Sequence, residues 1–246
     1  MELTVQYSSF FLILITVMAV LYSSVGHGGA SGYLAAMAFF NLSPDVMRPA
    51  ALIMNIFVAS LVLWHLSRER IFNWRLFLPI ATGSIPFAII GGGITLDESH
   101  YKWLIGCLLV LAAVLMIFRI PAHERTVPVK PWLALLFGAL LGFVSGLTGV
   151  GGGIYLSPLL LVLSWTTMRE SAAIAAGFIL VNSSAGLLGY LSISAQMPKG
   201  IPVLVVCALM GAFLGARMAV RSASVTMLRR LLGIVLIIAG TKTVLG

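Results

Sequence analysis

Long apolar segments without charged side chains recur along the whole chain, and no other sequence feature constrains its fold as strongly. Charged residues make up only 9% of the 246 residues, against about a quarter in soluble domains. Hydropathy gives ten apolar segments, at residues 8–25, 30–41, 49–66, 74–95, 101–118, 132–147, 154–165, 171–191, 201–216 and 229–245. Several are long enough to cross a hydrocarbon core of about 30 Å. Because they lack the period-two alternation of a membrane β-barrel, the sequence predicts an all-α polytopic membrane protein.

Two glycine clusters interrupt this apolar pattern. The first is "YSSVGHGGASGYL" at residues 22–34, and the second is "GLTGVGGGIYLSPL" at residues 146–159. Each cluster is followed by a short apolar segment that suits a half-helix better than a full span. Two topologies fit this pattern: a kinked helix at each cluster with eight crossings in total, or a re-entrant hairpin at each cluster with six crossings.

The basic residues of the loops distinguish between these topologies. Most Lys and Arg residues lie in three loops, at 67–75, 119–131 and 217–230. With re-entrant hairpins all three loops lie on one face of the membrane, whereas eight crossings divide the basic residues almost evenly. The positive-inside rule therefore favours hairpins, with both termini outside.

The two halves of the sequence resemble each other. "GHGGASGYLAAM" parallels "GVGGGIYLSPLL", and each cluster is followed by a turn with an arginine and then by a helix with an asparagine, Asn55 or Asn182. The sequence thus predicts two repeats, residues 1–120 and 132–246, joined by a cytoplasmic linker at 121–131 within one integrated membrane domain. Each repeat would contain a Gly-broken re-entrant helical hairpin plus three transmembrane helices. An odd number of crossings inverts the second repeat relative to the first, as in many secondary transporters.

Both glycine clusters, together with the C-terminal "GAFLGARMAVR…LRRLLGIVLIIAG", resemble the TauE/SafE family of sulfite and organosulfonate exporters. The resemblance covers essentially the whole chain. It implies a cytoplasmic-membrane exporter of small sulfur-containing anions. One departure lies within the glycine clusters, where the first has His27 and the second has Val150.

The chemistry of the glycine clusters suits an anion. Glycine adopts positive φ and lets the backbone approach a ligand, and a half-helix that begins at midplane points its N–H groups into the cavity. Serine, threonine and asparagine side chains nearby add neutral donors. The expected substrate-binding residues are Ser24, Gly26, His27, Gly28, Gly29, Ser31, Asn55, Thr148, Gly149, Gly151, Gly152, Gly153, Asn182 and Ser183. The alternative is that these glycines only permit close helix packing.

Charged and titratable residues narrow the functions further. The seven acidic residues, Glu2, Asp45, Glu69, Asp97, Glu98, Glu124 and Glu170, fall in a terminus or in predicted loops. A chain without an intramembrane carboxylate is poorly suited to carry cations or to perform carboxylate-based hydrolysis. His27 is the histidine nearest the predicted midplane, where it would couple transport to protons or bind the anion. Alternatively, it packs as a neutral side chain.

Two arginines occupy matching turns after the glycine clusters, Arg48 and Arg169. They are expected either to attract anions at the two mouths of the pathway or, as is commoner, to anchor their helices at the interface.

These features predict a secondary transporter, acting as an exporter, that moves sulfite or an organosulfonate by alternating access. The alternatives are a channel or a transporter for another small anion. From another functional class, the alternative is a membrane-embedded enzyme or a structural subunit. No cofactor, metal site or nucleotide-binding loop is expected, and the net charge of +8 is attributed to cytoplasmic loops rather than nucleic-acid binding. The expected partners are the anionic substrate, the lipid bilayer and a coupling proton or sodium ion, while the oligomeric state is left open.

Overall fold

The helices of the structure follow the apolar segments of the sequence. The computed structural model describes residues 8–24, 28–67, 71–118, 126–194, 197–219 and 225–245. Within these ranges it contains ten α-helices and no β-strand, which confirms the all-α prediction. The helices are α2 (Ser9–Ser24), α3 (Ala30–Phe39), α4 (Pro44–Ser67), α5 (Trp74–Gly92), α6 (Glu98–Ile117), α7 (Pro131–Thr148), α8 (Gly153–Val162), α9 (Met168–Ile193), α10 (Ile201–Ala219) and α11 (Val225–Leu245).

Several helices begin where the local sequence provides a cap. The side chains of Asn73 and Asp97 accept hydrogen bonds from the first turns of α5 and α6. Helix α9 begins at a capping box between Thr167 and Glu170, and α7 begins with Pro131 in its first turn. Such residues satisfy or remove the free N–H groups of a first turn, so these boundaries are set locally.

The acidic residues lie at the N-terminal ends of helices. Asp45, Glu98 and Glu170 belong to the first turns of α4, α6 and α9, and Asp97 precedes α6. The sequence had placed these residues in loops. In the structure they lie within or just before the first helical turn, about one turn from the predicted position. Negative charge is favourable there because it faces the positive end of the helix dipole. None of these four carboxylates is buried; Glu2, Glu69 and Glu124 lie outside the described residues.

Five of the described helices are long and apolar enough to cross a membrane: α4, α5, α6, α7 and α9. Four of them correspond to predicted crossings, while α7 corresponds to the first limb of the second predicted hairpin. Helix α2 is shorter, with 16 residues, and α3 and α8 have 10 residues each. Helices α3 and α8 follow the two glycine clusters, so both clusters lead into a short helix, as the sequence indicated.

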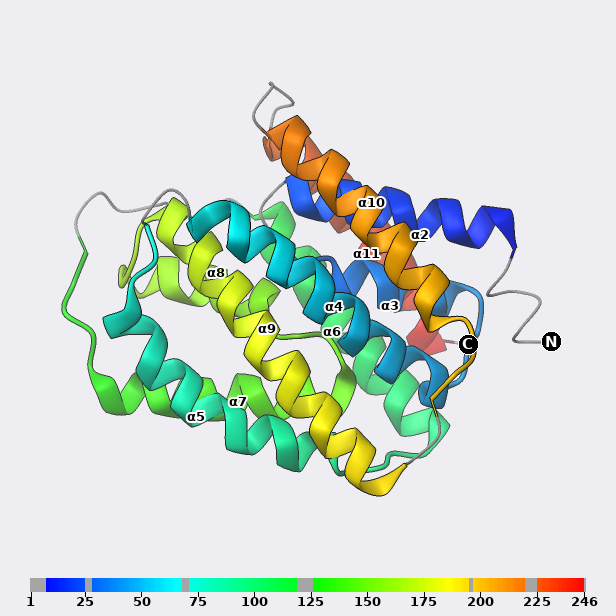
Figure 1. The fold of residues 1–246 in the computed structure, drawn as a ribbon, viewed down its shortest axis with the longest axis horizontal. Helices are drawn as coiled ribbons and strands as arrows, with labels where there is room; N and C mark the ends of the chain where they lie inside the picture. Colours follow the sequence, from blue (N-terminus) through cyan, green and yellow to red (C-terminus); the bar gives the residue numbers. More distant parts are fainter. Residues whose placement is uncertain are drawn as a thin grey trace.

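The helices pack mainly in pairs drawn from the two halves of the chain (Figure 1). Helices α4 and α9 run side by side across the middle of the view, with α5 and α7 paired at the lower edge. Helices α2 and α10 pair at the upper edge, and α11 packs on α6. Each principal pair therefore joins one helix from the first half to one from the second half.

Small residues allow two of these pairs to approach closely. Gly138, Gly142 and Gly146 recur every four residues along α7 and face α5. A Cβ on Gly142 would lie 2.4 Å from the carbonyl oxygen of Ser84, and one on Gly146 would lie 2.0 Å from that of Ala88. Gly211 and Gly215 of α10 meet the backbone of α2 in the same way. These helix glycines have the packing role that small residues commonly have in membranes.

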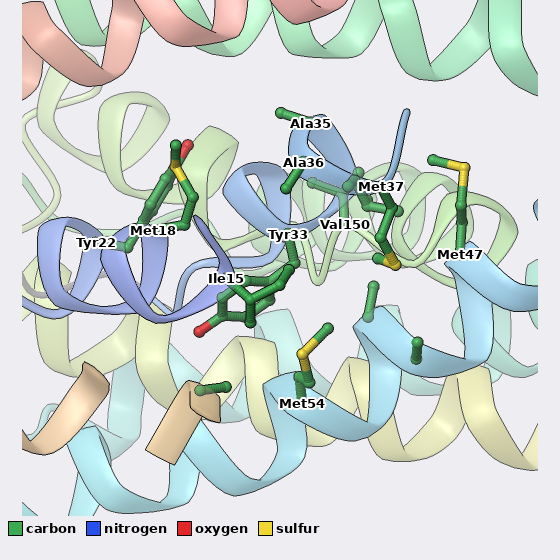
Figure 2. Close-up of a cluster of buried hydrophobic side chains, with 14 of the residues drawn as sticks. Ile15, Met18, Tyr22, Tyr33, Ala35, Ala36, Met37, Met47, Met54 and Val150 are labelled. Carbon is green, nitrogen blue, oxygen red and sulfur yellow. The ribbon is translucent and has the colours of Figure 1, made fainter. Parts of the chain in front are cut away.

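One apolar core connects the neighbourhoods of the two glycine clusters. Figure 2 shows Met18 and Tyr22 of α2, Tyr33 of α3 and Met54 of α4 gathered with Val150, which lies between α7 and α8. All five side chains are buried. The two clusters are far apart in the sequence but share this core.

Candidate functional site

The two glycine clusters contain two interruptions of helical structure: the first break lies between α2 and α3, where residues 28 and 29 are described, and the second break is formed by residues 149–152. In the first break Gly29 has a φ of +89°, and in the second break Gly149, Gly151 and Gly152 have φ values of +84°, +78° and +73°. Side chains are disfavoured in this left-handed region, whereas glycine adopts it freely. At these four positions the backbone conformation therefore favours glycine.

Both short helices begin at a left-handed glycine. Gly29 precedes α3 and Gly152 precedes α8, and neither helix start has a side-chain cap. The first turns are nevertheless buried, including Ser31 of α3 and Ile154 of α8. Buried N–H groups at the positive end of a helix need an acceptor, and an anion is a suitable one.

Asn55 of α4 lies between the two breaks. Its side chain is fully buried, and Nδ2 donates to the carbonyl oxygen of Gly149 at 3.4 Å and to Oγ of Ser183 at 3.3 Å. The other amide atom, Oδ1, has no partner among the described residues and would lie 4.0 Å from a Cβ on Gly28. A Cβ on Gly151 would lie 2.8 Å from Nδ2. One amide therefore contacts the second break and faces the first.

Ile179 of α9, in the second half of the chain, also lies between the two breaks. A Cβ on either Gly28 or Gly151 would lie 3.1 Å from one of its methyl groups, and one on Gly153 would lie 2.5 Å from Cδ1. Sequence reasoning missed Ile179, since an isoleucine in an apolar segment carries no signal of its own. Asn55 and Ile179 together form the contact at which the two breaks meet.

Side chains of the first half hold the second break in place. The hydroxyl of Tyr101 donates to the carbonyl oxygen of Thr148 at 2.8 Å. Oγ1 of Thr148 donates to the carbonyl oxygen of Val144 at 2.6 Å and accepts from the N–H of Val150 at 3.4 Å. The hydroxyl of Thr148 thus supports the local backbone.

Arg48 was expected at a mouth of the pathway or at the interface, and that expectation is wrong. The side chain is buried, with 5% of its surface exposed. Its Nε donates to the carbonyl of Gly146 at 3.0 Å, Nη1 to that of Ile94 at 2.8 Å, and Nη2 to those of Gly91 and Gly92. The carbonyls of Gly91, Gly92 and Gly146 belong to the C-terminal ends of α5 and α7, whose partial negative charges attract a cation. The carbonyl of Ile94 follows α5 by two residues. Arg48 therefore joins two helix ends next to the second break.

The remaining predicted side chains have local partners. Ser24 donates to the carbonyl of Leu21, Ser31 donates to the hydroxyl of Tyr22, and Asn182 donates to the carbonyl of Phe178. The structure thus brings together Gly28, Asn55, Gly149, Gly151, Gly153 and Ser183, while Ser24, Ser31 and Asn182 have hydrogen-bond partners elsewhere. Gly26 and His27 lie outside the described residues.

Five buried polar atoms have no hydrogen-bond partner in the described part of the chain: Oγ of Ser23, the hydroxyl of Tyr33, Oδ1 of Asn55, Oγ of Ser145 and Oδ1 of Asn182. Two of them lie at the first break. The Tyr33 hydroxyl packs against Gly29, where a Cβ would be 2.6 Å away, and Oδ1 of Asn55 faces Gly28. Sequence reasoning missed Tyr33, although a hydroxyl in the first turns of a short helix was a usable signal.

Metal-binding groups were also sought in the described residues. No cluster of three or more His, Cys, Asp or Glu side chains suited to a metal ion occurs there. Cys107 and Cys207 are both unpaired and half-buried.

Long apolar helices, buried glycine breaks and neutral polar side chains at their meeting point define an integral membrane protein of the transporter class. The sequence model of the "Sulfite exporter TauE/SafE" family matches residues 11–243. The chain therefore belongs to the TauE/SafE family of membrane transporters.

Several curated proteins are similar to the chain. "Probable membrane transporter protein y4hK" of Sinorhizobium fredii is 36% identical over 231 residues, which cover 92% of this chain and 94% of that protein. "Probable membrane transporter protein YjnA" of Bacillus subtilis is 25% identical over 89% of this chain and 92% of its own. "Probable membrane transporter protein MJ0441" of Methanocaldococcus jannaschii is 29% identical over 57% of this chain and 54% of its own. No solved structure matches the chain.

Proposed function

We propose that this protein is a secondary transporter that exports a small sulfur-containing anion, such as sulfite or an organosulfonate, by alternating access around the two breaks. The observation that carries the proposal is the position of Asn55, whose amide bonds to the second break and faces the first. A site shared by both halves of a transporter can open to either side as the halves move against each other.

An inverted repeat is supported by the way the helices pair. Exchanging the two halves converts the α5–α7 pair into the α10–α2 pair, while the α4–α9 and α6–α11 pairs convert into themselves. The short helices α3 and α8 also end alike, because Asn41 and Ser164 each follow by two residues with φ values of +55° and +53°. On this basis each repeat contributes a re-entrant hairpin and three crossings.

The proposed orientation places both termini outside the cytoplasmic membrane. It is supported by the basic loops of the sequence and the positive-inside rule. It is also consistent with Figure 1, where α2 begins and α11 ends at the same, right-hand end of the molecule.

Anion binding follows from the chemistry of the meeting point. The uncapped starts of α3 and α8 provide N–H groups, which are favourable ligands for an oxyanion. The described carboxylates are exposed or half-buried at helix ends, so no described acidic side chain opposes an anion at this point. We assign no catalytic residue and regard the protein as a transporter rather than an enzyme. His27 remains our candidate for proton coupling, and sodium remains the alternative coupling ion.

The proposal is tested by measuring sulfite flux in liposomes that contain the purified protein. Wild-type protein should show saturable, gradient-driven flux. Asn55→Ala should reduce this flux about tenfold or more, because it removes the polar contact between the breaks. Ser184→Ala is the control, since Oγ of Ser184 bonds only to its own helix at Leu180. Flux that rises linearly without saturation would indicate a channel, and absence of flux for all sulfur oxyanions would contradict the proposal.

A further inference from the structure

Tyr33 differs from every other tyrosine in the described part of the chain. Tyr22 accepts a hydrogen bond from Ser31. The hydroxyls of Tyr101, Tyr155 and Tyr190 donate to backbone carbonyls. Tyr33 is fully buried, and its hydroxyl has no partner among the described residues. A buried O–H without an acceptor is unfavourable, so such a group in a native protein needs an explanation.

Asn55 carries a buried acceptor without a partner, which complements the buried donor of Tyr33. A backbone carbonyl only accepts hydrogen bonds, so the amide atom next to the carbonyl oxygen of Gly149 must be the donor, Nδ2. This fixes the orientation of the amide and leaves Oδ1, an acceptor, on the side of the first break. Oδ1 is as completely buried as the Tyr33 hydroxyl and has no described partner either.

The unpaired donor and the unpaired acceptor lie against consecutive residues. The Tyr33 hydroxyl packs on Gly29, and Oδ1 of Asn55 faces Gly28. Gly29 is also the left-handed residue at which α3 begins without a side-chain cap. A phenol donor and an amide acceptor therefore lie next to the two consecutive glycines that precede the uncapped start of α3.

We infer that Tyr33 and Asn55 are specificity-determining residues of the proposed anion site, and that the species they select carries a hydrogen-bond donor of its own. This inference rests on the proposed function. The phenol and the helix start bind the oxyanion oxygens, while Oδ1 of Asn55 accepts a hydrogen bond from an O–H or N–H group of the substrate.

The inference predicts that closely related sulfur anions bind with different affinities, depending on whether they carry a hydrogen-bond donor. Hydrogensulfite has an acidic hydrogen, and amino- or hydroxyalkylsulfonates have an N–H or O–H group. The sulfite dianion and simple alkylsulfonates have oxyanion oxygens but no donor, so they would leave Oδ1 unpaired. A site that is built to hydrogen-bond a substrate group rejects analogues that lack it.

The Tyr33 hydroxyl is tested by Tyr33→Phe, which removes a single oxygen. In liposome flux measurements, KM for sulfite should rise about 3- to 10-fold, the value of one hydrogen bond. The melting temperature should not fall, because the lost hydroxyl has no described partner. Tyr155→Phe is the matched control: its hydroxyl bonds to the carbonyl of Leu108 at 2.8 Å, so the melting temperature should fall and KM should not change. An unchanged KM in Tyr33→Phe would overturn the role of Tyr33.

The donor requirement is tested by the pH dependence of wild-type flux. If hydrogensulfite is the bound form, KM expressed as total sulfite rises about tenfold per pH unit once the dianion predominates, because only the competent fraction binds. 2-Hydroxyethanesulfonate keeps its hydroxyl donor and does not change protonation in this range, so its KM controls for titration of the protein. At fixed pH, 2-hydroxyethanesulfonate should have a lower KM than ethanesulfonate.

The outcomes separate the inference from the proposed function. A KM for sulfite that is independent of pH, or equal KM values for the two ethanesulfonates, would overturn the inference while sulfite transport itself stands. Absence of flux for every sulfur oxyanion with wild-type protein would overturn both.

Discussion

Both breaks end at a left-handed glycine, Gly29 or Gly152, but they are supported by different contacts. The second break is held by side chains from elsewhere in the fold: Arg48 bonds to the helix ends beside it, Tyr101 bonds to Thr148, and Asn55 bonds to Gly149. At the described part of the first break, residues 28–29, the side chains nearest to a Cβ built on Gly28 are Ile179 and Asn55, and the side chain nearest to one built on Gly29 is Tyr33.

This difference indicates a division of roles between the breaks. Hydrogen bonds to backbone carbonyls fix a loop in one conformation, whereas packing contacts alone leave the polar groups nearby available. The unpaired hydroxyl of Tyr33 and Oδ1 of Asn55 lie on the side of the first break. We therefore expect changes at the second break to affect mainly stability and changes at the first break to affect mainly substrate recognition.

The largest expected effect follows from Arg48→Met. This change leaves the carbonyls of Gly91, Gly92, Ile94 and Gly146 without their guanidinium donor, which should cost about 3 kcal/mol or more of stability. Thermal unfolding of the purified protein in detergent measures the loss. Arg48→Lys should recover part of it, because it retains the charge without the planar fork. The exposed Arg75 of α5 provides the control, Arg75→Met, and equal losses in the two Met variants would contradict the role of Arg48.

Alanine at the two left-handed helix starts compares the breaks directly. Gly29→Ala and Gly152→Ala should each lose about 1–2 kcal/mol, the cost of a side chain in this backbone region. A Cβ on Gly29 would displace the Tyr33 hydroxyl, 2.6 Å away, whereas one on Gly152 would meet the ring of Phe178 at 2.7 Å. Gly29→Ala should therefore raise KM for sulfite more than Gly152→Ala does. A larger KM change in Gly152→Ala would reverse the division of roles.

A smaller effect is expected from Tyr101→Phe. The variant loses the hydrogen bond to the carbonyl of Thr148 and about 1 kcal/mol of stability, which lowers the melting temperature by about 2–4 °C. KM for sulfite should not change, because this hydroxyl serves the second break. A KM increase as large as that of Tyr33→Phe would show that the hydroxyls of Tyr101 and Tyr33 have equivalent roles.

The smallest effect is expected at Asp97, outside both breaks. Hydrogen bonding from the backbone N–H of His100, together with contact to its ring, lowers the pKa of this exposed carboxyl below its usual value of 3.8. A lowered pKa in the folded state stabilises the protein above the unfolded value of about 4, and this stabilisation is lost as the pH falls through the folded pKa. Asp97→Asn retains a cap without the charge. Its melting temperature should be slightly below that of wild type at pH 7 and equal to it at low pH; a constant difference would contradict this account.

The sequence by itself determined the type and approximate limits of the ten helices in the described residues, because hydropathy and capping are local properties. It also located the glycine interruptions, since Gly29, Gly149, Gly151 and Gly152 have backbone conformations that other residues rarely adopt. The family resemblance, carried by the same motifs, was confirmed over residues 11–243.

Only the tertiary structure decided which polar residues act together. Sequence reasoning treated Asn55 and Asn182 alike, yet Asn55 bonds to the second break and faces the first, while Asn182 donates to its own helix. Arg48 was expected near the surface but is buried between two helix ends, and Ile179 and Tyr33 were not singled out at all. Each of these roles depends on which helices pack against one another, and hydropathy along a chain carries no information about the neighbours that a side chain acquires from the other half.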